Sequence, residues 1–130
     1  MKIAVIGAGI AGVSLAKSLG ALPDYQVELF DKGRGLGGRM SVRHTGAYSF
    51  DHGAQFFTAR TTGFQAFLQT YQSAGLVEAW WPDIVTLAEA ESAGKRAWLE
   101  PHFVALPNMN GLCKAIAADL DVRLNTEVEI

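Results

Sequence analysis

The stretch Lys2-Ile3-Ala4-Val5-Ile6-Gly7-Ala8-Gly9-Ile10-Ala11-Gly12 stands at the start of the chain and decides its fold. Its apolar run from Ile3 to Ile6 is typical of a buried strand. The run passes directly into glycines spaced as G-x-G-x-x-G, and a helical pattern of apolar residues follows. This order of strand, glycine turn and helix predicts the phosphate-binding turn of a dinucleotide-binding fold.

Each glycine of the turn has its own physical role. Gly7 allows the tight turn out of the strand, Gly9 lets the backbone approach a pyrophosphate, and Gly12 lets the helix pack closely on the strand. The start of the helix adds free N–H groups and the positive end of its dipole. We therefore expect the cofactor phosphates at Gly7, Gly9, Ile10, Ala11 and Gly12.

A second strand and an acid complete the pattern. The helix is expected to stop at Gly20, and Val27 to Phe30 to form the next strand. Asp31 then stands where a carboxylate accepts hydrogen bonds from an adenosine ribose. A structural glycine turn would not account for the strands and the acid. An export signal beginning at Lys2 fits poorly, because three glycines and Lys17 interrupt the apolar run.

Composition restricts the remaining possibilities. With 130 residues, 49% of them hydrophobic, the chain can build one sizeable core. A formal charge of −2 gives no reason to expect nucleic acid or an acidic membrane as partner. The single cysteine, Cys113, excludes an internal disulfide and fits a reducing compartment, so a cytoplasmic location is expected.

The residues after Asp31 depart from a simple dehydrogenase pattern. Residues 32–40 contain four glycines and three basic residues, which favours a flexible loop over a helix. Backbone N–H groups and a guanidinium in such a loop can meet anionic oxygens, and Arg39 is the best candidate for a phosphate contact. Further along, the small residues Gly53 and Ala54 would let a planar ligand lie against the backbone, and Gln55 could bond its polar edge.

The middle of the chain reads as a β-rich insertion. Before it, residues 41–43 and 48–50 are expected to form two short strands around a turn. A helix capped by Thr61 or Thr62 should follow, with strands at 77–81, 84–88 and 96–99. A second helix, capped by Asn108, is expected to run to Leu120, and then strands at 122–124 and 126–130. We therefore predict an α/β fold, a Rossmann-like FAD-binding βαβ domain interrupted by a β-rich substrate-domain insertion. Its expected parts are residues 1–58, the insertion from 59 to 107, and the return at 108–130. With one βαβ unit, the chain is expected to be part of a larger two-domain fold.

Other chemistries lack their motifs. The three histidines and Cys113 have no zinc-ligand spacing, so no metal site is predicted. The chain contains neither a G-x-S-x-G elbow nor a G-x-x-x-x-G-K-[ST] loop. No further stretch is long and apolar enough for a membrane span.

Three segments together resemble the flavin amine oxidase superfamily, and most closely its renalase-like branch. They are the first glycine motif with its acid, the segment Gly37-Gly38-Arg39-Met40, and the segment Phe50-Asp51-His52-Gly53-Ala54-Gln55-Phe56-Phe57-Thr58. The resemblance implies FAD as the tightly bound cofactor. It places Asp31 and Lys32 at the ribose and Val128 at the adenine. The remaining contacts it implies are Gly38, Arg39 and Met40 along the pyrophosphate and Gly53, Ala54 and Gln55 at the flavin ring.

The same resemblance implies a reaction. Renalase-like enzymes transfer a hydride from a small substrate, a reduced nicotinamide isomer or an amine, to FAD and then pass the electrons to oxygen. The flavin carries this chemistry, so no protein nucleophile is needed. Two alternatives stay open: an NAD-dependent dehydrogenase or reductase that uses the same first motif, and a non-catalytic nucleotide-binding module.

Overall fold

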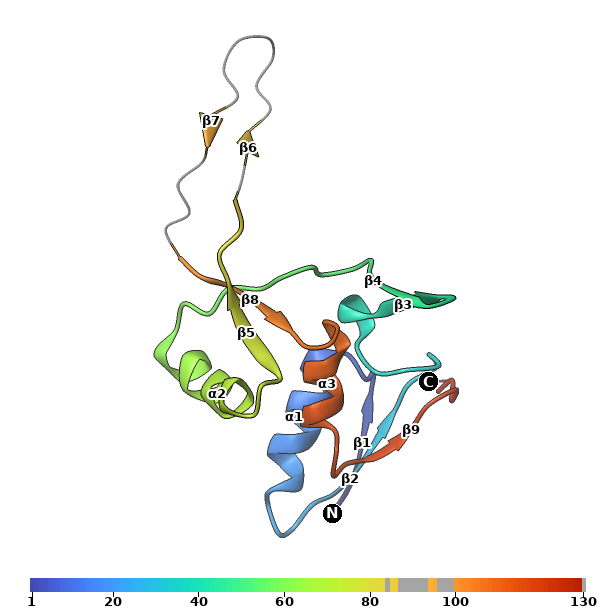
Figure 1. Ribbon diagram of the computed structural model, residues 1–130. Coiled ribbons are helices and arrows are strands. Elements are labelled where there is room, and N and C mark those ends of the chain that lie inside the picture. The colour runs from blue at the N-terminus through green and yellow to red at the C-terminus, as the bar shows by residue number, and fades with distance from the viewer. Residues whose placement is uncertain (84, 87–93, 96–99, 130) are drawn as a thin grey trace.

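The computed structural model describes residues 1–83, 85–86, 94–95 and 100–129 (Figure 1). The predicted βαβ unit is present as β1 (Lys2–Ile6), α1 (Ile10–Gly20) and β2 (Gln26–Phe30). β1 and β2 pair in parallel, with Lys2 opposite Gln26 and Ile6 opposite Phe30. The short strand β9 (Asp121–Arg123) adds to β2, again in parallel, which gives the sheet order β1-β2-β9. The predicted α/β class is therefore confirmed.

The core lies between this sheet and the helices on one of its faces. Val5 and Leu29 point from the sheet toward the buried residues Val13 and Ala16 of α1. The helix α3 (Asn110–Ile116) lies beside α1, and its residues Leu112 and Ile116 join the same core (Figure 1). Close packing of these side chains fixes α1 over β1 and β2, and with it the glycine turn that joins them.

A short hairpin follows the glycine-rich loop. The loop ends in a 3-10 turn, η1 (Gly38–Met40), and β3 (Val42–Thr45) then pairs with β4 (Tyr48–Asp51) in antiparallel fashion. The hairpin was expected, but the 3-10 turn was not. It forms because Gly37 and Gly38 adopt positive φ angles of 128° and 53°, which side chains rarely tolerate.

The inserted part has its own antiparallel pairing. After α2 (Thr62–Ser73), β5 (Val77–Trp80) pairs with β8 (His102–Ala105), and β6 (Val85–Thr86) pairs with β7 (Gly94–Lys95). Thr61 caps α2, since its hydroxyl accepts from the backbone N–H of Phe64. The expected strands over 84–88 and 96–99 lie largely outside the described residues.

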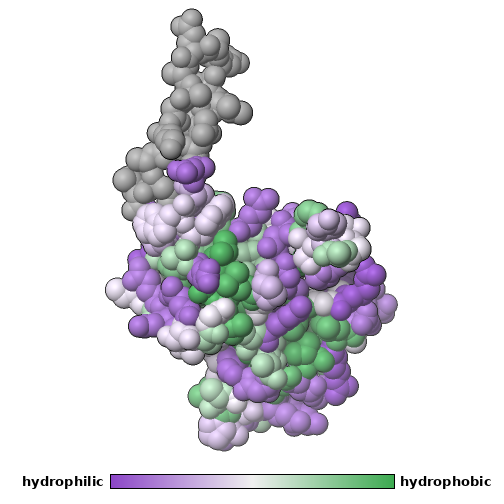
Figure 2. All heavy atoms as spheres, in the orientation of Figure 1, coloured by the Kyte–Doolittle hydropathy of each residue, from purple (hydrophilic) through white to green (hydrophobic). Residues whose placement is uncertain are grey.

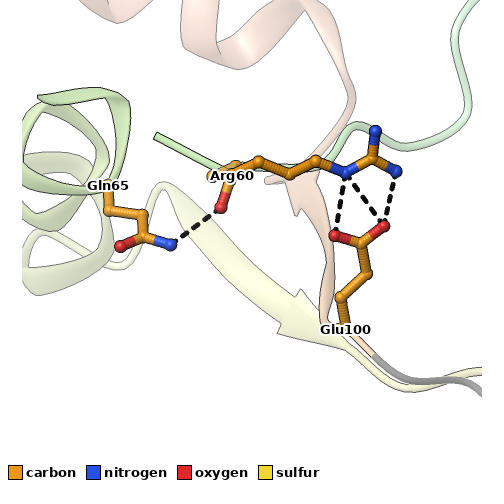
Figure 3. A network of polar contacts seen from close by, with 4 residues as sticks. Arg60, Gln65 and Glu100 are labelled. Carbon is orange, nitrogen blue, oxygen red and sulfur yellow. Dashed lines mark hydrogen bonds and ion pairs between the residues drawn. The ribbon is translucent and has the colours of Figure 1, made fainter. Parts of the chain in front are cut away.

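The chain leaves for this insertion and returns from it at one place. Phe57 and Phe103 exchange backbone hydrogen bonds of 3.0 and 2.8 Å. Nearby, the guanidinium of Arg60 binds the carboxylate of Glu100 through both Nε and Nη2, while Gln65 holds the backbone of Ala59 (Figure 3). The Phe57–Phe103 and Arg60–Glu100 contacts hold the two ends of the insertion side by side.

Two expectations at the C-terminal end are wrong. The last helix, α3, begins two residues after Asn108, has Met109 at its N-cap, and ends at Ile116 instead of Leu120. Asn108 lies outside the helix, and the N–H of Met109, the residue that follows it, donates to the carboxylate of Asp51 at 3.0 Å. The second error is the strand expected at 126–130: residues 126–129 form no strand, since Asn125, with φ of 54°, turns the chain away from the sheet.

Apolar side chains also occur on the surface. Figure 2 shows them in separate patches among polar residues on the face turned to the viewer. The exposed large apolar side chains include Trp80 and Trp81, which are 44% and 60% exposed. None of the helices within the described residues has the length and apolar character that a membrane crossing requires.

Candidate cofactor-binding site

The glycine turn after β1 is built as its spacing predicts. Gly7 has a φ of 102°, and its N–H donates to the carbonyl oxygen of Phe30 at 2.7 Å. A Cβ on Gly12 would overlap the carbonyl oxygen of Gly7, so only glycine lets α1 approach the strand this closely. Gly9 stands at the N-cap of α1 with an ordinary φ of −77°.

A second glycine segment lies directly against the first. Gly37 donates to the carbonyl oxygen of Ala8 at 3.0 Å, and Gly37 and Gly9 form an isolated parallel bridge. A Cβ on Gly38 would lie 3.2 Å from the Cα of Gly9, tighter than side chains normally pack. Two stretches of bare backbone therefore meet at the N-terminus of α1. Such a surface lets a pyrophosphate approach N–H groups without a side chain between them.

Asp31 points into this turn. Its Oδ2 accepts from the N–H of Ala8 at 2.5 Å, and its Oδ1 accepts from the N–H of Gly33 at 2.6 Å. The carboxylate thus ties the end of β2 to the turn after β1. Each carboxylate oxygen has a second lone pair, so these bonds leave Asp31 able to accept from a ribose hydroxyl as well.

A cleft of about 330 Å³ opens beside Asp31. It lies where the carboxyl ends of β1, β2 and β9 meet, the edge at which open parallel sheets bind their ligands. Its lining is Ile6, Gly7, Asp31, Lys32, Thr126, Glu127 and Val128. Gly7, Asp31, Lys32 and Val128 were all predicted as cofactor contacts, and the structure brings these four together.

The segment after β9 forms one wall of the cleft. The N–H of Asn125 donates to the carbonyl oxygen of Gly33 at 3.0 Å, and the N–H of Thr126 donates to that of Asp31 at 2.9 Å. These bonds hold the segment against the residues that follow β2. Val128, 39% exposed, is thereby placed at the cleft, about a hundred residues along the chain from Asp31.

The other predicted contacts lie outside this cleft, in a second zone. Ala54 donates to the carbonyl oxygen of Arg39 at 2.8 Å, and a Cβ on Gly53 would overlap that same oxygen. The side chains of Arg39 and Gln55 are exposed, whereas Met40 is buried with its sulfur 3.9 Å from Sγ of Cys113. Met40 can therefore offer a cofactor its backbone but not its side chain.

Charges near the glycine segments are mostly basic. Lys32, Arg34 and Arg39 have exposed side chains on the loop between Asp31 and η1. Cys113, beneath this loop, is fully buried, and burial raises the pKa of its thiol from 9.0 to about 11. The thiol is therefore neutral near pH 7 and unsuited to act as a nucleophile. Among the described residues, no three histidine, cysteine or acidic side chains gather as metal ligands would.

Sequence reasoning missed four residues of these two zones. Ile6, Thr126 and Glu127 line the cleft, and Asp51 joins β4 to α3. Ile6 and Thr126 are recoverable from the rule that ligands sit beyond the carboxyl ends of parallel strands. Asp51 carried no local signal, since its hydrogen-bond partner, Met109, is distant in sequence.

Comparison with known families agrees with this geometry. A family model described as an NAD(P)-binding Rossmann-like domain matches residues 5–71, just over half of the chain. The chain belongs to this family. The match begins within β1 and runs through the glycine turn, Asp31, the basic loop and the segment 53–55 into α2. A dinucleotide-binding domain of the Rossmann-like type is thus established.

Individual relatives each match part of the chain. The 4,4'-diapophytoene desaturases (4,4'-diaponeurosporene-forming) of Staphylococcus aureus strains Newman and USA300 are 42% identical over 53 residues, which is 41% of this chain and 10% of each desaturase. A solved structure, the "putative protoporphyrinogen oxidase" from Exiguobacterium sp. 255-15, is 19% identical with a TM-score of 0.49, over 65% of this chain and 19% of that one. The matched regions span about a tenth to a fifth of the lengths of these relatives.

Proposed function

We propose that this Rossmann-like domain is the FAD-binding portion of a flavin-dependent oxidoreductase. One observation carries the proposal: two glycine segments are hydrogen-bonded to each other at the N-terminus of α1. The carboxylate of Asp31 accepts a hydrogen bond from the first of them. A single glycine motif suits many nucleotides. The second segment, which begins with Gly37 and Gly38, adds bare backbone directly beside the first, and this supports a cofactor such as FAD that continues beyond its pyrophosphate.

The proposed contacts follow the cofactor from one end to the other. Val128 and Thr126 line the space for adenine, while Asp31 and Lys32 stand at the ribose. Gly9, Ile10, Ala11 and Gly12 meet the pyrophosphate from one side, and Gly38, Arg39 and Met40 from the other. Gly53, Ala54 and Gln55 approach the ring. In the bound state the flavin supplies hydride acceptance and electron transfer to oxygen.

The division of the chain is part of the same proposal. Residues 1–58 and 108–130 supply the cofactor domain, and residues 59–107 begin a substrate domain. The paired backbones of Phe57 and Phe103 support these boundaries, because they bring the two ends of the insertion together. Small-molecule substrates are expected to bind between the two domains, next to the segment 53–55.

The proposed reaction is oxidation of a small molecule with oxygen as the final acceptor. An amine substrate loses a hydride and a proton, whereas a reduced nicotinamide isomer loses a hydride alone and the second proton comes from solvent. In both cases oxygen takes up two electrons and two protons to become hydrogen peroxide. A reduced nicotinamide isomer or an amine is the substrate class implied by the resemblance to the flavin amine oxidase superfamily. The renalase-like branch remains a prediction, and the desaturase relatives make a compound like diapophytoene the competing substrate.

An NAD-dependent dehydrogenase or reductase is the second candidate. The family description itself names NAD(P), and Asp31 would favour NAD because a carboxylate repels a 2′-phosphate. The basic loop and its 3-10 turn argue for FAD, since they occupy the place where a dehydrogenase would continue into another helix.

The deciding experiment is a spectrum followed by a titration. The longest natural form of the protein is purified, and its visible absorption is recorded. A flavin band, or tight binding of added FAD with weak binding of NAD, supports the proposal. Binding of NAD without binding of FAD would replace it with the dehydrogenase, and retained FAD without electron transfer to oxygen or a dye would favour a non-catalytic module. Peroxide release is then measured with amines, reduced nicotinamide isomers and diapophytoene as separate substrates.

A further inference from the structure

Asp51 joins two segments that lie far apart in the sequence. It is the last residue of β4, and its Oδ1 accepts from the backbone N–H of Met109 at 3.0 Å. Met109 is the N-cap residue of α3 and has no side-chain cap of its own. The carboxylate of Asp51 therefore satisfies an N–H at the start of a helix that no neighbouring residue caps.

The support on the α3 side is rigid. Met109 is 1% exposed, and its sulfur accepts from the N–H of Ala105 in β8 at 3.4 Å. A Cβ on Gly111 would crowd the carbonyl oxygen of Leu106, so the start of α3 is packed closely on the segment before it. Fully packed groups of this kind move little, and Asp51 is bonded directly to them.

The residues that follow Asp51 in the chain include Gly53, Ala54 and Gln55, the predicted contacts of the flavin ring. Two residues further on, Gly53 lies against the carbonyl oxygen of Arg39, and Ala54 donates to that oxygen at 2.8 Å. The segment 51–55 is thus fixed at two points: by Asp51 to α3, and by Ala54 to the turn η1. The turn η1 is in turn linked to the first glycine motif, through the bond from Gly37 to Ala8.

From this arrangement we propose that Asp51 is a positioning residue for the cofactor. By anchoring the segment 51–55 to the start of α3, it fixes the position of Gly53, Ala54 and Gln55 relative to the flavin ring. The proposal rests on the proposed FAD function and adds a residue to it. Asp51 acts through its neighbours and needs no contact with the cofactor.

The test compares Asp51→Ala with Asp51→Asn in the longest natural form of the protein. Asparagine keeps an oxygen that can accept from Met109, whereas alanine has none. Asp119→Ala is the matched control, because it also removes a carboxylate and an interaction, the exposed ion pair with Lys17. Three quantities are measured: amide hydrogen exchange at Ala54 and Met109 without cofactor, FAD affinity, and the position of the flavin absorption bands.

We expect Asp51→Ala to speed exchange at both amides and to weaken FAD binding by about tenfold, with shifted flavin bands. Asp51→Asn should restore all three to near the wild-type values, and Asp119→Ala should leave them unchanged. The shifted bands matter because a merely destabilised protein would keep the same ring environment whenever FAD is bound.

Each contrary result has its own meaning. Unchanged exchange in Asp51→Ala would show that the anchor does not exist. Faster exchange with unchanged FAD affinity and spectrum would show that the anchor has no role in cofactor placement. Equal losses in both variants would assign the effect to the charge of Asp51 and overturn the positioning role. If the wild-type protein binds no FAD, the proposed function and this role both fail, while the exchange data still report separately on the anchor.

Discussion

The carboxylate of Asp31 accepts a hydrogen bond from the backbone N–H of Ala8 at 2.5 Å, although the two residues belong to different strand ends. This bond makes the acid part of the phosphate-binding turn. Asp31, which the sequence predicts as a ribose contact, therefore also stabilises the backbone of the turn. Substitutions at this site can lower the stability of the turn, the affinity for the cofactor, or both.

Replacement of Asp31 should lower both the stability of the protein and its affinity for the cofactor. Asp31→Ala leaves the N–H groups of Ala8 and Gly33 without their partner, and we expect a loss of about 1–3 kcal/mol in unfolding free energy together with weaker cofactor binding. Asp31→Asn keeps one acceptor oxygen and should lose less of both. Urea unfolding and isothermal titration with FAD and ADP measure the two effects. Full stability in Asp31→Ala would contradict this stabilising role.

Gly12→Ala should damage the fold itself. The added Cβ would overlap the carbonyl oxygen of Gly7, so α1 has to move off the sheet, at a cost of about 1–3 kcal/mol. Gly63→Ala in α2 is the control, because its Cβ would meet nothing within 4 Å. There we expect a gain of about 0.5–1 kcal/mol from better helix propensity. Thermal unfolding of both variants gives the comparison, and equal stabilities would disprove the close approach at Gly12.

Gly9→Ala, unlike Gly12→Ala, should weaken cofactor binding with little change in stability. Its Cβ would find ordinary contacts, 3.8 Å from Cα of Gly38 and 3.9 Å from the carbonyl oxygen of Gly37, and its φ of −77° suits any residue. Stability should stay within about 0.5 kcal/mol of wild type. The methyl group would, however, lie between the two glycine segments, where the proposed function puts the pyrophosphate. We expect FAD affinity to fall by at least about tenfold, and an unaltered affinity would place the phosphates elsewhere.

Cys113 should make stability fall at high pH. Burial raises the pKa of its thiol from 9.0 to about 11, so the folded state holds this proton more tightly than the unfolded state does. The stabilisation is complete below pH 9 and is lost as the pH rises toward 11, by about 2–3 kcal/mol. The difference in unfolding free energy between wild type and Cys113→Ala, followed from pH 8 to 11, isolates this contribution from other groups. A difference that stays constant with pH would show that the thiol titrates normally.

Local patterns predicted the βαβ unit with its glycine turn and Asp31, whereas Lys32 and Val128 were expected from the resemblance to the flavin amine oxidase superfamily. Strand, glycine turn and helix each carry a signal within a few residues, and the parallel pairing of β1 with β2 follows from them. Gly7, Asp31, Lys32 and Val128 converge on one cleft because three strand ends meet there. That all four contact a cofactor stays a prediction, as it does for the other expected contacts, among them Ile10, Gly38 and Gln55, since only a bound cofactor can test them.

The errors share a physical cause, which is that a distant residue or a backbone angle decided the outcome. Asn108 was expected to cap the helix, but the helix begins two residues later, where Asp51, from another part of the chain, accepts from the N–H of Met109. The strand expected after Thr126 does not form, because the positive φ of Asn125 diverts the segment to the cleft. The 3-10 turn at Gly38–Met40 likewise depends on two glycine angles that composition alone does not reveal.

The meeting of Phe57 and Phe103 has a consequence for how such a protein can evolve. Because the backbones of Phe57 and Phe103 are hydrogen-bonded to each other, the segment between them begins and ends at neighbouring points of the domain. Segments joined in this way can be lengthened, trimmed or exchanged with little strain on the host domain. Replacing residues 61–100 by the corresponding segment of a homologue should therefore leave the fold of the Rossmann-like domain intact.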